Sequence, residues 1–444
     1  MQSDAYIEPV FDFEHSESGV FLASGAIEIT VDGAIYKTVG EARLDILPKP
    51  RIRFCGRFAG GILFGALSTV LNSNTHMSFS FNGRHIEVLL DSIRIQSSRH
   101  GQFTEVSCIP SFEPILLVGD QSTLMTRVVF HVFNFVDVIG TRRSIRENEA
   151  IEYVTLTNDD WIVYLQSLPI TKRNIKELKA AGGYRLTHVG MIEKCDGSDF
   201  SGQEGEMMLE ALCFFLSFAK GGWCPAICPV GFDRSGRLVW QRWSSPREFW
   251  RPILSWFDPH HSEQLQLLFA LFMRRWVTDD WEKALRECIY WYVNANNPSA
   301  GIEAGIIFTQ AAIERLSYEY TVRERRLLGV DGFKQLKASD KFRLLFSSLD
   351  IPLDIPDECI ELRTLASRVN WQDSPHALTE IRNSIVHPER KNREQLADVL
   401  YEAWNLGLWY LEMSILAICG YNGHYGNRLK KRFIGQVENV PWKK

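Results

Sequence analysis

An arginine and a histidine five residues apart are the groups in this sequence best suited to chemistry, within residues 382–387 (RNSIVH). The guanidinium of Arg382 can donate two parallel hydrogen bonds to a phosphate. The imidazole of His387 can accept or donate a proton near neutral pH. Asn383 could orient the imidazole or contact the phosphate. These three side chains are candidate catalytic residues for RNA cleavage that uses no metal and no cofactor.

The cleavage reaction sets a further requirement on this segment. When the ribose 2′-hydroxyl attacks the adjacent phosphate, one group must remove the hydroxyl proton and another must protonate the leaving 5′-oxygen. One copy of the segment supplies one histidine. A symmetric dimer that places two copies face to face would supply both proton-transfer groups.

The segment must be positioned by a helix predicted over residues 374–386. Leu378, Ile381 and Ile385 fall on one stripe and are expected to face a core, because side chains three and four residues apart share a helix face. Arg382 and Asn383 lie off that stripe. Pro388 disfavours helical geometry at the residue before it, so the helix is expected to end at His387.

Further helices are predicted throughout the C-terminal part of the chain. Apolar residues recur on a helical period over residues 279–294, 301–323, 339–349, 357–368 and 392–419. The connections between these helices are short, which favours an antiparallel bundle.

The N-terminal part has a different pattern, rich in β-branched and aromatic residues. Strands are predicted within residues 19–38, 85–96, 127–137 and 161–168, and helices from Thr171 to Gly182 and over 204–220. We therefore predict an α+β multidomain protein. Residues 1–258 form a β-rich sensor or regulatory region of one or two subdomains, and residues 259–435 form an all-α helical bundle.

Composition limits the classes of partner. The 444-residue chain is long enough for two or three domains, and its net charge of -5 gives no overall basic field to attract nucleic acid. An RNA site must therefore be a local patch. Nine irregularly spaced cysteines favour reduced thiols in a cytoplasmic protein. No targeting signal and no membrane segment is expected.

Several other segments have two interpretations each. Arg390, Lys391 and Arg393 are predicted RNA contacts, and the basic residues of 428–432 either contact RNA or aid solubility. Four tryptophans in residues 239–257 either stack bases or, as we prefer, join domains by packing. Cys224 and Cys228 are interpreted as packed thiols at a turn rather than zinc ligands.

On Arg382, Asn383 and His387, followed by Pro388-Glu389, the chain resembles the HEPN superfamily of helical domains. In that pattern an arginine, usually followed by a polar residue, precedes a histidine by about four to six residues. The resemblance covers roughly residues 260–430. It implies a bundle of helices that forms a homodimer and, in many members, a metal-independent endoribonuclease. It also implies an acidic residue on an earlier helix, for which Glu314 is the candidate.

Many active members of that superfamily are toxins or act in anti-phage defence, which implies RNA, with tRNA as one candidate, as the substrate. A wider likeness to bacterial anti-phage proteins with a β-rich front end implies that the N-terminal region binds a phage-derived or other trigger. Two alternatives stay open: a non-catalytic dimerisation scaffold with a ligand-binding N-terminal domain, and phosphate or nucleotide binding without cleavage.

Overall fold

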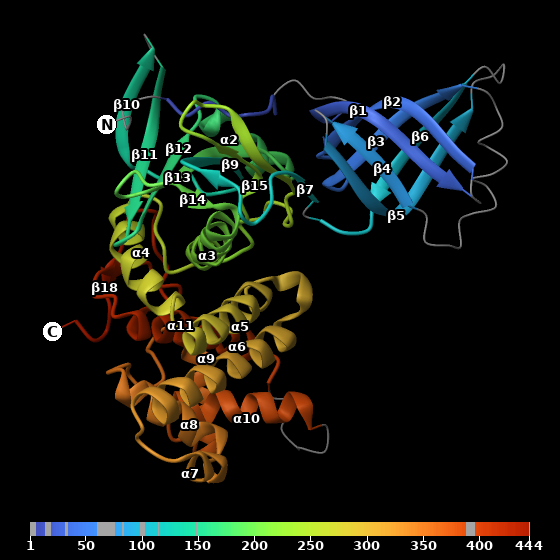
Figure 1. The fold of residues 1–444 in the computed structure, drawn as a ribbon. Helices are drawn as coiled ribbons and strands as arrows, with labels where there is room; N and C mark the ends of the chain where they lie inside the picture. Colours follow the sequence, from blue (N-terminus) through green and yellow to red (C-terminus); the bar gives the residue numbers. More distant parts are fainter. Residues whose placement is uncertain are drawn as a thin grey trace. The chain divides into compact units, whose positions relative to one another are not determined.

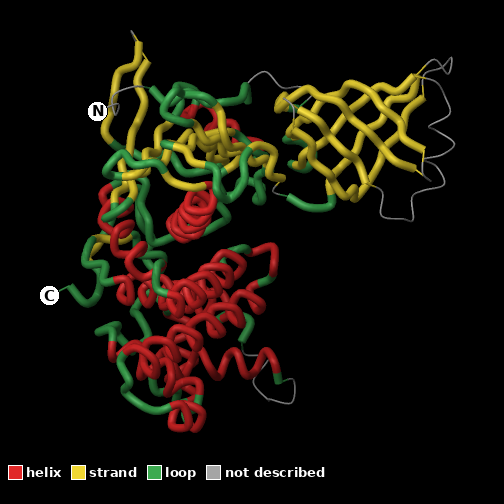
Figure 2. The backbone as a smooth tube through the Cα atoms, viewed as in Figure 1, coloured by secondary structure: helices red, strands yellow, loops and turns green. Residues whose placement is uncertain are grey.

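The computed structural model describes most of the chain. The described ranges are 6–13, 19–31, 34–59, 76–81, 84–97, 103–113, 115–146, 149–387 and 396–443. They form a mixed α+β protein, with strands in the N-terminal region and helices in the C-terminal region, as predicted (Figures 1 and 2).

The chain divides into two compact units, each made of several sequence segments. The first unit comprises residues 1–135, 160–209 and 225–250, and the second comprises 136–159, 210–224 and 251–444. The predicted boundary near residue 258 thus has a counterpart at Arg251. Two earlier segments also belong to the second unit, because their contacts are made with residues far along the chain.

Six strands of the first unit close into a barrel, drawn in blue and cyan in Figure 1. In barrel order they are β1 (Val20–Val31), β2 (Ala34–Asp45), β3 (Arg51–Ala59), β6 (Phe103–Pro110), β5 (Arg84–Ser97) and β4 (His76–Phe81). All neighbouring strands are antiparallel. Every second residue of β6 is buried, so one set of side chains fills the barrel and the other faces outward. Phe54 and Phe79 pack within the filled interior.

The rest of the first unit is built on six strands of an eight-stranded sheet. In spatial order these six are β12 (Trp161–Ser167), β13 (Leu186–Lys194), β9 (Arg127–Phe133), β15 (Ile227–Phe232), β16 (Leu238–Trp243) and β7 (Ile115–Val118). A small pair, β8 (Leu124–Met125) with β14 (Phe200–Ser201), and helix α2 (Thr171–Ala181) accompany it. Helix α3 (Gly202–Lys220) begins in this unit and its residues from Glu210 onward belong to the second. The strand predicted over 127–137 is correct in position but ends at Phe133.

The second unit is mostly helical (Figure 2). Its helices are α4 (Glu263–Trp276), α5 (Asp279–Ala295), η1 (Pro298–Ala300), α6 (Ile302–Ser317), the π-helix η2 (Tyr318–Glu324), α7 (Val330–Gln335), α8 (Ala338–Ser348), α9 (Ile360–Val369), α10 (Ser374–Val386) and α11 (Leu400–Cys419). Two hairpins complete it: β10 (Thr141–Arg146) with β11 (Glu149–Thr157), and β17 (His424–Tyr425) with β18 (Glu438–Asn439).

Each predicted helix has a counterpart, and α4 and α7 were not predicted; three predicted ends differ from the structure. The helix predicted over 357–368 begins at Ile360. The helix predicted over 301–323 changes to π geometry after Ser317. The helix predicted over 392–419 begins at Leu400, because residues 397–399 form a turn, while 392–395 lie outside the described residues.

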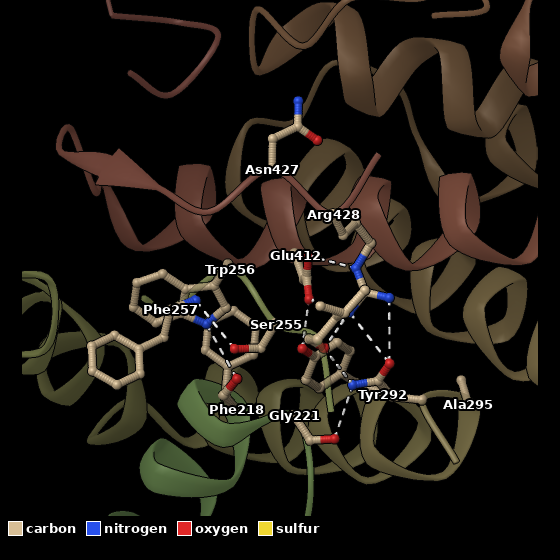
Figure 3. A network of polar contacts seen from close by, with 12 residues as sticks. Phe218, Gly221, Ser255, Trp256, Phe257, Tyr292, Ala295, Glu412, Asn427 and Arg428 are labelled. Carbon is tan, nitrogen blue, oxygen red and sulfur yellow. Dashed lines mark hydrogen bonds and ion pairs between the residues drawn. The ribbon is translucent and has the colours of Figure 1, made fainter. Parts of the chain in front are cut away.

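Helix α11 is the centre of the second unit, since 16 of its 20 residues are buried. Its Glu412 is completely buried and forms an ion pair with the equally buried Arg428 of the C-terminal tail, at 2.7 Å (Figure 3). The Tyr292 hydroxyl donates to the same carboxylate at 2.6 Å. Burial, and then the charge of Glu412, raise the pKa of Tyr292 well above its usual value.

The same arginine also joins segments that are distant in sequence. Arg428 donates to the carbonyl of Leu254 at 2.8 Å, and Asn296 donates to the carbonyls of Leu254 and Gly221. The end of α3, the segment before α4, helix α5, helix α11 and the tail therefore meet at one hydrogen-bonded cluster (Figure 3). A buried charge is tolerated only when it is paired and hydrogen-bonded, so this cluster fixes the positions of these five segments relative to one another.

A second contact holds the tail farther along. The buried carboxylate of Asp258 accepts from Arg432 at 2.7 Å and from the Gly435 amide at 3.0 Å. Beside it, the two ring nitrogens of His261 face a Glu263 carboxylate oxygen at 2.8 Å and the Gly435 carbonyl oxygen at 3.1 Å. Both neighbours are acceptors, so only the doubly protonated imidazolium satisfies both contacts.

Replacing Glu412 by glutamine should destabilise the second unit strongly, because it leaves the Arg428 charge buried without a counterion. We expect the free energy of unfolding to fall by about 3–5 kcal/mol. Urea denaturation followed by tryptophan fluorescence measures this. The control is Lys430→Met, which breaks the exposed pair with Glu438 and should cost no more than about 1 kcal/mol. Equal losses in the two variants would contradict the role given to Glu412.

The tail contact at His261 should depend on pH. Desolvation lowers the pKa of this imidazole, but the bonds to Glu263 and Gly435 outweigh it, and the pKa lies above the usual 6.5. A histidine whose pKa is higher in the folded state than in the unfolded state makes its full contribution to stability at a pH below the unfolded-state pKa. That contribution is lost as the pH rises through the folded-state pKa. The unfolding temperature of the parent should therefore fall, between about pH 6 and about pH 8, by more than that of His261→Gln. Parallel curves for the two proteins would refute the expectation.

Candidate active site

Helix α10 carries the predicted site and is anchored firmly at its start. The Asp373 carboxylate accepts from the backbone amide of His376 at 2.9 Å and so caps the helix. The same carboxylate accepts two hydrogen bonds from Arg343 of α8, at 2.6 and 2.9 Å. The negative charge also suits the positive end of the helix dipole. The beginning of α10 is thus fixed to α8 by a charged, two-bond contact.

One face of α10 packs into the second unit as predicted. Leu378 and Ile381 are buried, whereas Ile385 is half-buried. Gln310 of α6 donates to the carbonyl of Leu378 at 2.6 Å. Arg382 lies off this buried stripe and is half-buried.

Helix α10 ends where the sequence predicts. His387 leaves the helix with φ -116° and ψ 93°, while its amide still donates to the Asn383 carbonyl at 2.9 Å. The imidazole is exposed. The following proline accounts for this ending, because proline disfavours helical geometry at the preceding residue. Arg382, Asn383 and His387 therefore lie together at the end of one helix.

Within the described part of the chain, no carboxylate pairs with the charge of Arg382. Across the described residues its guanidinium contacts the Asn383 amide oxygen, at 3.4 Å, and no acidic side chain. The other half-buried arginines of helices α4–α10 all pair with carboxylates; they are Arg275, Arg286, Arg315 and Arg343. A half-buried cation next to a neutral amide is suited to receive an anion such as phosphate.

Glu314 is not joined to these three residues. It lies on α6, where its carboxylate pairs with Lys341 of α8. Among the described residues, no hydrogen bond or ion pair links it to Arg382, Asn383 or His387. The expected acidic member of the site is therefore engaged in a contact between α6 and α8.

The predicted basic contacts divide into two groups. Arg390, Lys391 and Arg393 lie outside the described residues. The tail cluster is described, and three of its basic residues are neutralised by internal carboxylates: Arg428 pairs with Glu412, Arg432 with Asp258 and Lys430 with Glu438. These pairs favour a structural role for the tail cluster over contact with RNA.

Three tryptophans of residues 239–257 pack within single units, and their preferred interpretation as a join between domains stays a prediction. Trp240 and Trp243 are buried in the first unit, and Trp256 is buried in the second. The Trp256 indole donates to the Phe218 carbonyl at 3.2 Å. These three rings are therefore closed to bases.

Cys224 and Cys228 are both buried, and burial raises the pKa of the Cys228 thiol to about 12. Across the described residues, no three His, Cys, Asp or Glu side chains are arranged to hold a metal ion. Within the same ranges, every helix is too short or too polar to cross a bilayer.

Sequence reasoning did not single out two features. The sequence around Arg343 does not identify its ion-pair partner. Asp373 directly precedes a helix, and this position identifies it only as a helix cap. The arginines of β3 at positions 51, 53 and 57 alternate with apolar residues, which is the period-two signal for one outward face of a strand.

Comparison with known proteins places the chain in a family. Residues 120–253 match the domain described as the YopA central domain, and residues 278–439 match the YopA C-terminal domain. The chain is 31% identical over 431 residues to a Bacillus subtilis (strain 168) protein named "SPbeta prophage-derived uncharacterized protein YopA", covering 95% of this chain and 94% of that one. The chain belongs to the YopA family. No solved structure matches it.

The contrast between Arg382 and Arg343 can be tested by stability alone. Arg343→Met should lower the free energy of unfolding by about 1–3 kcal/mol, since it leaves the buried Asp373 carboxylate without its cation. Arg382→Met should change it by less than about 0.5 kcal/mol, because no internal carboxylate loses its partner. Chemical denaturation measures the free energy of unfolding of both variants and of the parent. A larger loss for Arg382→Met would show that this arginine is structural.

Proposed function

We propose that this protein is a metal-independent endoribonuclease whose active site is the end of helix α10. The observation that carries the proposal is the half-buried guanidinium of Arg382, which has no carboxylate partner among the described residues and lies five residues before the exposed His387 at the end of the same helix. The first group suits a phosphate and the second suits proton transfer. The resemblance of this segment to the HEPN superfamily supports the same chemistry.

In the proposed reaction the ribose 2′-oxygen bonds to the adjacent phosphorus while the bond from phosphorus to the 5′-oxygen breaks. One imidazole takes the 2′-hydroxyl proton, and a second gives a proton to the leaving oxygen. The products are a 2′,3′-cyclic phosphate and a 5′-hydroxyl. Arg382 stabilises the negative charge on the crowded phosphate, and Asn383 holds the guanidinium through its amide oxygen.

Two copies of the chain are required by this scheme, because each supplies one His387. We therefore propose a homodimer in which the ends of two α10 helices face a shared RNA strand. Arg390, Lys391 and Arg393 follow directly in the sequence and would contact the flanking phosphates. Glu314, held by Lys341, is left out of the reaction.

The biological setting is proposed from the same likeness. The prophage origin stated for the Bacillus relative is in keeping with a toxin or an anti-phage defence protein that acts on cytoplasmic RNA, with tRNA as one candidate. The β-rich N-terminal region would then sense a phage-derived or other trigger and restrain the nuclease until it binds.

The purified full-length protein should cleave 5′-labelled tRNA in the presence of EDTA and leave 2′,3′-cyclic phosphate ends. His387→Ala should lower the rate by at least about 100-fold, which is typical for loss of a general acid or base. Arg382→Ala should lower it by about 100-fold to 1000-fold through lost charge stabilisation. Gel mapping and end-group analysis measure both effects.

The matched controls are His424→Ala and Arg363→Ala, which remove an exposed histidine and an exposed, Asp357-paired arginine of the same unit. Both should cleave like the parent, and an RNA with 2′-deoxyribose at the cleaved position should resist. A silent parent should be repeated with phage lysate as the trigger source. Equal cleavage by all variants, or silence under both conditions, would favour the scaffold alternative.

A further inference from the structure

The outer face of the barrel carries a regular array of charged side chains. Along β3, Ile52 and Phe54 are buried inside the barrel, while Arg51, Arg53 and Arg57 project from the opposite face. From Arg51 to Cys55, every second side chain faces outward and the others face the barrel interior. The strand geometry itself therefore places the arginines on the outer face.

The strand register brings arginines from neighbouring strands to this face. Arg43 of β2 lies directly opposite Arg53 of β3. Arg94 of β5 is opposite Ser107 of β6, which in turn is opposite Cys55 of β3. Like charges directly opposite each other destabilise a sheet, so the Arg43–Arg53 pair must be offset by carboxylates. Glu41 and Asp45 of the same barrel supply them.

Carboxylates compensate only part of the array. Arg53 holds both oxygens of Asp45 at 2.7 and 2.8 Å, Arg43 pairs with Glu41 at 2.7 Å, and Arg57 pairs with Glu105 at 2.7 Å. Because Arg53 occupies both Asp45 oxygens, the Arg51 Nε atom is left 3.7 Å from that carboxylate and makes no hydrogen bond within the described part of the chain. Among the described residues, no carboxylate lies within 4.0 Å of the exposed Arg94.

These residues line a hollow of the first unit rather than a flat surface. The cavity has a volume of about 1740 Å³, and its wall includes Arg51, Arg53, Arg57 and Arg94 together with Cys55 and Ser107. Such a volume exceeds the usual pocket for a drug-sized molecule, of roughly 300–1000 Å³. It can hold a molecule of the size of a nucleotide or a dinucleotide.

We propose that this face of the barrel is a binding site for a small organic phosphate with two or more phosphate groups, in the nucleotide class. Arg51 and Arg94 are the principal anchors. Two strand spacings and four residues separate their backbones, a distance of about 16 Å, and their long side chains can converge from both ends on one elongated anion. Ser107 and Cys55 lie between them. Two anchors on one hollow favour a small molecule over a nucleic-acid strand, which needs a positively charged groove that follows its backbone.

The site is independent of the nuclease proposal, because it rests on the first unit alone. If both are correct, the ligand is the trigger that the barrel senses. The full-length protein should bind ATP in isothermal titration calorimetry at low ionic strength, and adenosine should not bind. Arg51→Met and Arg94→Met should each weaken ATP binding by about tenfold or more, the loss expected for a charge-assisted hydrogen bond.

The control is Lys37→Met, which removes one positive charge from the same barrel at a residue that pairs with Glu28 and does not line the cavity. Lys37→Met should bind ATP like the parent. His387→Ala should also bind ATP like the parent, so the ATP-binding test is separate from the test of RNA cleavage. Absence of ATP binding by the parent overturns the proposal. So does an equal loss in Lys37→Met. If a single-stranded RNA binds at the same arginines and ATP does not bind, the ligand is RNA and the proposal of a small phosphate ligand is refuted.

Discussion

The buried ion pair between Glu412 and Arg428 is the constraint on which the helical unit depends. Helix α11 is surrounded by apolar packing, and a carboxylate in its middle can be accommodated only by a cation that reaches it from outside the helix. Arg428 does so from the tail and simultaneously engages the segment before α4. The tail is therefore an internal part of the bundle. The segment before α4, the end of α5 and helix α11 are thereby held together, and α10 packs against α11, α6 and α8 of the same unit.

The same principle distinguishes structural charges from available ones. In the helical unit Arg343 is matched to Asp373 and thereby fixes the start of α10, whereas Arg382 at the other end of that helix faces only an amide among the described residues. In the barrel Arg53 makes two hydrogen bonds to Asp45, whereas the Nε atom of Arg51 beside it reaches that carboxylate only at 3.7 Å. Among the described residues, each unit thus has one arginine that holds an element through carboxylate hydrogen bonds and another whose charge is less fully compensated.

Local patterns were sufficient for most of the helices and for a minority of the strands, but not for the long-range partners of either. The bounds of α10 follow from Asp373 and Pro388, which act within a few residues of the helix ends. Glu412 is the sole charged residue of 403–419, a signal of a buried pair, but nothing local identifies Arg428 as its partner. Barrel closure and the pairing of Glu314 with Lys341 likewise arise from contacts across the fold. For the candidate site, the sequence predicted the helix that carries Arg382, Asn383 and His387, and their catalytic role stays a prediction. It could not foresee that Glu314 pairs with Lys341.

The discontinuous composition of the helical unit limits how this protein can be inherited. Its packing includes Phe215 against Phe269, and the Trp256 indole bonded to Phe218, so residues encoded well upstream complete its core. A single crossover near codon 258 would deliver an incomplete bundle with exposed aromatic surface. Genetic exchange is therefore expected to move the region from about residue 115, where β7 begins, to the tail as one block, because β9 pairs with β13 and β15 of the same sheet. The barrel strands all lie within residues 20–110, so the barrel can be replaced as a separate unit.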